Sequence, residues 1–177
     1  SKRTPAAIDP LGTDADGEEV KESWNYASVI GMMMYLASNA YPEIQFAVHQ
    51  CARFTHCPKQ SHAQAVKCIC KYLKYVLQKE EGLTFKINTG YQLDCYADAD
   101  FAGLWNHEDV QDSVCDKSRS GYVMTLAGCP IHWVSKLQTV IALSTLESKY
   151  ICLSQAMHKF ISMRQLLKEI IQNLVPE

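Results

Sequence analysis

Two aspartates, Asp98 and Asp100, stand where an apolar stretch ends and a glycine turn begins, within Tyr96–Gly103 (YADADFAG). Carboxylate oxygens at a strand end are hard ligands that suit a divalent cation. On a strand, residues i and i+2 point to the same face, so the two carboxylates converge only if the strand continues through Asp100. If the strand ends after Asp98, Asp100 enters the turn instead. The alternative without a metal is that Asp and Gly simply terminate a strand.

The elements that must position this pair are helices in the first half and strands in the second. Apolar residues at helical spacing predict helices over Trp24–Ala40, Pro42–Phe54, Ser61–Leu77 and Thr145–Ile170. Short apolar runs between turn residues predict strands over Leu83–Ile87, Leu93–Ala97, Tyr122–Leu126, Ile131–Val134 and Thr139–Leu143. This order predicts an α+β fold in which a helical segment precedes a sheet with a C-terminal helical arm.

Three segments follow from the pattern. Residues 1–22 are polar and contain prolines, glycines and an acidic run, which predicts a flexible linker. Residues 23–82 form the helical segment, and residues 83–177 hold the strands and the last helix.

Composition excludes several classes of protein. Hydrophobic residues make up 47% of the 177 residues, which is enough for a packed core, and the net charge of −2 gives no bulk attraction to nucleic acid. No apolar run is long enough to span a bilayer, so no membrane partner is expected. The eight cysteines lack zinc-site spacing, and the N-terminus lacks a secretion signal. We therefore expect reduced thiols in an intracellular protein, cytoplasmic or nuclear.

The third helical stretch carries a basic face interleaved with tyrosines. Such a face could lie against a phosphate backbone, which would give weak binding of nucleic acid. The alternative is an ordinary solvated helix face. The candidate nucleic-acid-binding residues are Arg53, Lys67, Lys71, Tyr72, Lys74 and Tyr75.

Seven segments, taken together and in this order, resemble the C-terminal part of the copia-type retrotransposon Pol polyprotein. They are Trp24–Gly31, Phe46–Gln50, Ala52–Phe54, Tyr72–Lys74, Asp98–Gly103, Lys117–Val123 and Trp133–Gln138. The resemblance runs from about Trp24 to about Ile170. It implies that residues 23–82 correspond to thumb and connection helices at the end of a reverse transcriptase. It implies that residues 83–177 correspond to a ribonuclease H domain with a mixed sheet, which cuts RNA in an RNA–DNA hybrid.

The resemblance also implies roles for individual residues. Asp98 matches the first metal-binding aspartate, and Asp100 matches a second acid of the same motif. The family's helix motif reads Ser-Thr-Glu-Ala-Glu-Tyr. Glu147 matches its first glutamate, and Lys149 replaces its second, which the resemblance implies is the catalytic metal ligand. In an active member the cofactor would be Mg²⁺.

Two departures from the family pattern bear on activity. The Lys149 ammonium cannot ligate Mg²⁺ and repels it. Glu147 is no substitute, because it lies two positions away, roughly 200° around a helix. The chain ends at residues 175–177, before the position of the family's next catalytic aspartate in a motif like Asp-Asn-Gln-Ser-Ala. We therefore expect an incomplete domain, truncated before its last strands, with an exposed sheet edge that could self-associate.

The functional hypothesis is a retrotransposon-derived reverse transcriptase and ribonuclease H fragment. In this hypothesis Asp98 is a remnant of the catalytic site, the chain does not cut RNA, and residual nucleic-acid binding remains. The alternative is an active Mg²⁺-dependent ribonuclease H that other segments complete, with Asp98 and Asp100 binding the metal and Glu147 assisting.

Overall fold

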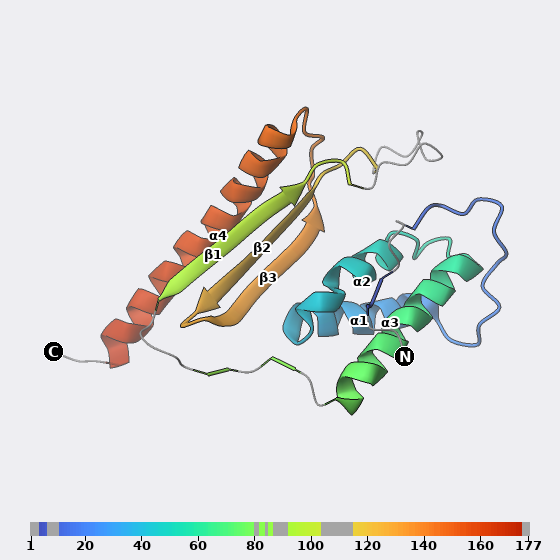
Figure 1. The fold of residues 1–177 in the computed structure, drawn as a ribbon, viewed down its shortest axis with the longest axis horizontal. Coiled ribbons are helices and arrows are strands. Elements are labelled where there is room, and N and C mark those ends of the chain that lie inside the picture. Colours follow the sequence, from blue (N-terminus) through green and yellow to red (C-terminus); the bar gives the residue numbers. More distant parts are fainter. Residues whose placement is uncertain are drawn as a thin grey trace. The chain divides into compact units, whose positions relative to one another are not determined.

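The computed structural model describes residues 4–6, 11–79, 82–83, 85–86, 92–103 and 115–174. The chain divides into two compact units, the first holding three helices and the second a sheet with one long helix (Figure 1). Helices therefore combine with an antiparallel sheet, and the predicted α+β class is confirmed.

The helical unit contains four elements in chain order. They are α1 (Tyr26–Asn39), the short 3₁₀ helix η1 (Pro42–Ile44), α2 (Gln45–Ala52) and α3 (Gln60–Gln78). The Asn25 side chain begins α1 by accepting a hydrogen bond of 2.9 Å from the Ser28 amide. Pro42 starts η1, because its fixed φ suits the first helical turn.

The core of this unit is formed by one stripe of α1 together with buried residues of η1, α2 and α3. Tyr26, Ile30, Met33 and Ala37 are buried at intervals of three and four residues. The Tyr26 hydroxyl donates to the Cys51 carbonyl over 2.9 Å. Burial raises the pKa of the Cys51 thiol to about 12 and also raises the pKa of Tyr26, because the buried environment disfavours both charged forms.

Part of the predicted flexible linker is attached to α3, which differs from the prediction. Residues 11–22 form a segment, here called the strap, whose Glu18 carbonyl accepts from the Gln60 amide over 2.8 Å. The buried His62 ring contacts the Gly12 carbonyl through Nε2, over 2.9 Å. Lys67 Nζ lies 2.5 Å from Glu22 Oε1. The strap is held by polar contacts distant in sequence, which hydrophobic periodicity does not report.

The sheet unit has three antiparallel strands in the order β1-β2-β3, namely β1 (Leu93–Asp100), β2 (Arg119–Leu126) and β3 (Cys129–Leu137). Ala127 and Gly128 connect β2 to β3, and both have positive φ (53° and 79°). Two positive φ values are the geometry of a tight two-residue hairpin turn, which glycine adopts at no steric cost.

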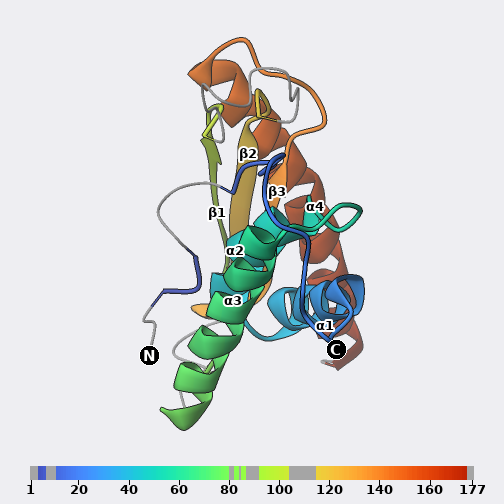
Figure 2. The same ribbon diagram turned by 90° about the vertical axis from the view of Figure 1, so that its right-hand side faces the viewer.

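Helix α4 (Thr145–Leu174) packs along β1 and β2, as Figure 1 shows and Figure 2 confirms from the side. The buried contact is made by Tyr122 and Met124 of β2 with Ala156 of α4. Gln138, which is 1% exposed, donates from Nε2 to Ser120 Oγ (3.0 Å) and to the Ser148 carbonyl (2.8 Å). It therefore links the sheet to the first turns of α4.

Three predictions of secondary structure need correction. The described strands are all antiparallel, so the predicted mixed sheet is not present among the described residues. Thr139–Leu143 is not a strand, and its exposed Ile141 and Leu143 have no strand partner to cover them. The described residues of Leu83–Ile87 are not in a strand either, while residues 84, 87 and 175–177 lie outside the described residues.

Candidate functional site

Strand β1 continues through both aspartates, so Asp98 and Asp100 lie on the same face of the sheet. Asp98 pairs with Gly121 and Asp100 with Arg119. The opposite face of β1 carries Cys95, which packs toward α4. The Asp98 side chain is 80% exposed. The strand therefore continues through Asp100, which is the backbone arrangement that two converging carboxylates require.

The carboxylate of Asp100 nevertheless lies over the turn that follows β1. It fills the space that a Cβ at Gly103 would occupy, so glycine is required there unless the carboxylate moves. Ala102, in the same turn, has a positive φ of 48°. Asp100 therefore combines the two arrangements that the sequence presented as alternatives, because its backbone is in the strand and its carboxylate packs on the turn.

Lys149 lies beside Asp98. Its Nζ is 3.4 Å from Asp98 Oδ1, and both side chains are largely exposed. The Ala99 backbone amide and then the Lys149 ammonium hold the pKa of Asp98 below its ordinary value, because both favour the charged carboxylate. The structure thus brings together the aspartate and the lysine that the resemblance placed in one metal site.

Glu147 has a different role, at the N-terminus of α4. Its Oε2 accepts a hydrogen bond of 2.6 Å from the Leu143 amide, and its own amide donates to Ser144 Oγ over 3.1 Å. These reciprocal contacts resemble a capping box, which satisfies amides that the first helical turn leaves unpaired. Glu147 therefore stabilises the helix end.

Cys152 was not among the predicted site residues. It is buried, and its thiol donates to the Asp98 carbonyl over 3.0 Å and approaches the Gly121 carbonyl at 3.5 Å. It therefore fixes the backbone of Asp98 against α4. Its spacing from Ser148, one helical turn earlier on the buried face, is the sequence signal that could have indicated this position.

The side chains of this site do not fit a Mg²⁺ ion. Magnesium needs several oxygen ligands in near-octahedral geometry. Here an ammonium stands beside Asp98 Oδ1, and Asp100 and Glu147 make other contacts. Within the part of the chain that the structure describes, no three His, Cys, Asp or Glu residues gather closely enough to hold a metal.

Only part of the predicted basic face of α3 is exposed and, among the described residues, without an ion pair that would compete with a phosphate backbone. Lys71 and Lys74 are exposed and lie one turn apart, and Tyr75 is half-buried next to them. The ammonium of Lys79 lies 5.7 Å from the centre of the Tyr75 ring. Lys67 shares this face but makes the ion pair with Glu22.

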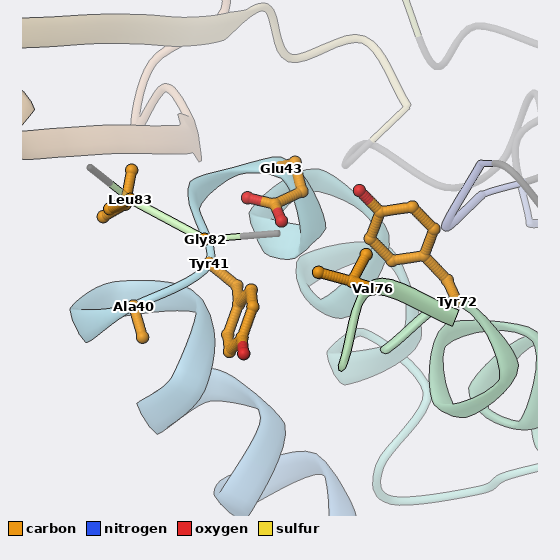
Figure 3. Close-up of a pocket in the computed structure, with 7 residues that line it drawn as sticks. All are labelled: Ala40, Tyr41, Glu43, Tyr72, Val76, Gly82 and Leu83. Atoms are coloured by element: carbon orange, nitrogen blue, oxygen red, sulfur yellow. The ribbon is translucent and has the colours of Figure 1, made fainter. Parts of the chain in front are cut away.

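Tyr72 and Arg53 lie elsewhere. Tyr72 lines a small pocket with Tyr41, Glu43 and Val76 (Figure 3) and packs against the helical core. The Arg53 guanidinium lies over the Phe54 ring, 5.2 Å from its centre. Phe54 in turn stacks on His62, with the ring centres 4.0 Å apart. The structure therefore does not bring Tyr72 or Arg53 to the face that carries Lys71.

Similarity to known proteins links these two units to transposons. The chain is 33% identical over 147 residues, or 83% of its length, to the retrovirus-related Pol polyprotein from transposon RE1 of Arabidopsis thaliana. It is 35% identical over 145 residues, or 82% of its length, to that from transposon TNT 1-94 of Nicotiana tabacum. The aligned residues cover 9% and 10% of these polyproteins. The chain thus spans about a tenth of the length of the polyproteins that it matches.

A shorter relative is the secreted RxLR effector protein 161 of Plasmopara viticola, which is 36% identical over 131 residues, 74% of this chain and 85% of that protein. The chain therefore belongs to one family with this protein and with retrotransposon Pol polyproteins. No protein-family model and no solved structure matches the chain. None of the described helices combines the length and the hydropathy needed to cross a membrane.

Proposed function

We propose that this chain is a retrotransposon-derived piece of a reverse transcriptase and ribonuclease H, whose ribonuclease H site is inactive and which retains weak binding of nucleic acid. The proposal that the ribonuclease H site is inactive rests on one observation: the Lys149 ammonium lies 3.4 Å from Asp98 Oδ1. The homology to Pol polyproteins supports the origin of the chain.

The physical argument rests on charge. In two-metal cleavage of a phosphodiester, carboxylates hold cations that activate water and stabilise the leaving oxygen. Lys149 supplies a positive charge where a cation would have to lie, and it occupies one oxygen of Asp98. A metal ion would have to displace this ammonium and also draw Asp100 away from Gly103. The arrangement therefore disfavours metal-dependent cleavage.

The first prediction is that the chain does not cut RNA in an RNA–DNA hybrid with Mg²⁺ or Mn²⁺ above the rate of the hybrid alone. The measurement is electrophoresis of a hybrid labelled on the RNA strand. The Asp98→Asn variant is the matched control, because it removes the carboxylate charge with little change in shape. Metal-dependent cleavage that disappears in Asp98→Asn would contradict the proposal and favour an active ribonuclease H.

Binding of nucleic acid is proposed for the exposed part of α3. Lys71 and Lys74 can contact successive phosphates from one helix face, and Tyr75 offers a ring beside them. Lys67 is expected to contribute less, because Glu22 already neutralises it. Two or three lysines predict a weak interaction with a marked salt dependence.

The second prediction concerns that salt dependence. Replacing Lys71 and Lys74 by alanine should reduce the slope of log binding constant against log salt by about 1 per lysine. Fluorescence anisotropy with a labelled hybrid between 50 and 200 mM salt, about the range over which phosphate contacts are lost, gives the slope. Lys136→Ala, at an exposed lysine of β3, is the control and should leave the slope unchanged. An unchanged slope in the double variant would exclude α3 as the binding face.

A further inference from the structure

Helix α4 carries an apolar stripe on the side that faces away from the sheet. The stripe consists of Leu146, Tyr150, Leu153, Met157 and Ile161, whose exposed fractions run from 40% to 64%. Their spacings of four, three, four and four residues keep them on one side of the helix. Ser148, Cys152 and Ala156 are buried and mark the side that packs on the sheet. By helical geometry the centre of the stripe lies roughly 140° around the axis from Cys152.

The exposed area of this stripe suits a dimer interface. A large apolar side chain presents about 200 Å² when fully exposed. At these exposed fractions, the five residues leave about 500 Å² uncovered in each copy. Two copies placed stripe to stripe would bury about 1,000 Å² from these side chains alone, which reaches the lower limit of a specific interface.

Charges at the two ends of the stripe favour an antiparallel pair. Glu147 flanks the stripe at the start of α4, where its carboxylate is exposed and its Oε2 accepts from the Leu143 amide, so an ion pair with a second copy would use Oε1. Arg164 follows Ile161 on the same side. If two copies cross antiparallel near residue 155, Glu147 of one copy lies opposite Arg164 of the other. The same alignment sets Tyr150 opposite Ile161 and Leu153 opposite Met157. The helix dipoles also oppose each other in this arrangement.

The size of one relative is consistent with a second copy as the occupant. The Plasmopara viticola protein is aligned with this chain over 85% of its own length, so little of it remains outside the aligned part. A family member of that size has little additional chain with which to cover an apolar helix face.

The β1 edge of the sheet is less suited to self-association. Among the described strands β1 and β3 are the two edges, and β1 carries Asp94, Asp98 and Asp100. Pairing β1 with β1 of a second copy would bring these like charges together, which is a common way for proteins to prevent edge pairing.

We propose that the chain forms a homodimer through antiparallel pairing of the α4 stripes, from Leu146 to Ile161. Each stripe packs against the same stripe of a second copy of the chain. This inference does not depend on whether either copy binds or cuts nucleic acid.

The test is sedimentation equilibrium of the full chain over a range of concentrations, with two matched variants. Leu153→Glu places a charge in the centre of the stripe and should weaken the dimer by on the order of 100-fold or more. Leu166→Glu is the control, because Leu166 is exposed to a similar degree (51% against 49%) but lies about 140° around the helix from Leu153. Circular dichroism of all three proteins establishes that the variants are folded.

A photo-crosslinking residue at position 150 then distinguishes the direction of the helices. Crosslinks between isotopically distinct copies should join position 150 to the neighbourhood of Ile161. A wild-type chain that is monomeric at all concentrations would overturn the proposal. A dimer that withstands Leu153→Glu, or that both variants weaken equally, would overturn it as well. Crosslinks from position 150 to position 150 of the other copy would exclude the antiparallel arrangement.

Discussion

Replacing Gln138 by alanine should lower the free energy of unfolding of the sheet unit by about 2–4 kcal/mol. The side chain is 1% exposed and donates two hydrogen bonds, to Ser120 Oγ and to the Ser148 carbonyl. Alanine removes both bonds and leaves a cavity between β2 and the first turns of α4. Native-state hydrogen exchange of the β2 and β3 amides, followed by NMR, measures the loss in this unit alone.

Gln138→Leu is the matched variant for this prediction. Leucine keeps most of the volume but cannot donate to Ser120 or Ser148. It also removes Gln138 Oε1, which is buried without a hydrogen-bond partner among the described residues. We therefore expect a loss of about 1 kcal/mol, smaller than for alanine. Equal protection in the wild type and in Gln138→Ala would show that Gln138 does not join α4 to the sheet.

Replacing Lys149 by glutamate should reverse the electrostatic environment of Asp98. In the wild type, the Ala99 amide and the Lys149 ammonium hold the pKa of Asp98 below its ordinary value. In Lys149→Glu the ammonium is replaced by a carboxylate, so the pKa of Asp98 should rise, although the Ala99 amide still opposes the rise. The measurement is NMR titration of the Asp98 carboxyl carbon in both proteins.

Lys149→Glu should also change how the free energy of unfolding depends on pH. Because the pKa of Asp98 is depressed in the folded wild type, its contribution to stability is present above the ordinary pKa of 3.8 that the group has in the unfolded chain, and is lost as the pH falls through the folded pKa. In Lys149→Glu the contribution at neutral pH is reduced or reversed. The difference in stability between the two proteins should therefore be largest near neutral pH and should shrink in acid.

Lys149→Glu should also bind Mn²⁺ about tenfold or more tightly than the wild type, because two carboxylates replace an ion pair. Paramagnetic broadening of the amide signals near Asp98 during Mn²⁺ titration measures this affinity. The double variant Lys149→Glu/Asp98→Asn is the control and should lose the gain. If the wild type and Lys149→Glu bind Mn²⁺ equally, Lys149 is not what excludes the metal.

Local patterns correctly predicted the helices and three of the five strands, but not which side of each helix is buried. Helical spacing in the first half correctly predicts a helix at Tyr26–Asn39, yet of its adjacent Met32 and Met33, the first is 60% exposed and the second is buried. Leu77 of α3 is likewise exposed. Neighbouring apolar residues on a helix differ by only 100°, so the pattern alone does not decide which of them meets a partner.

At the candidate site too, some features could be predicted without the structure and others could not. The resemblance to the Pol family placed Asp98 and Lys149 in one site, 51 residues apart in the chain, and the fold brings them to within 3.4 Å. The sequence did not reveal that Glu147 stabilises the N-terminus of α4, that Asp100 packs on its turn, or that the strap is attached to α3. These are hydrogen bonds and contacts of single polar groups, and composition and periodicity carry no signal for them.

By itself, therefore, the sequence determined the α+β class, the helices and the three strands that the structure contains, while the resemblance to the Pol family indicated that Asp98 and Lys149 belong together. Helices and strands follow from apolar periodicity, which is local. Only the tertiary structure decided which side of α4 meets the sheet and which remains exposed, and which carboxylates have other partners. Both depend on where distant segments pack, because burial and hydrogen bonding are set by neighbours in space.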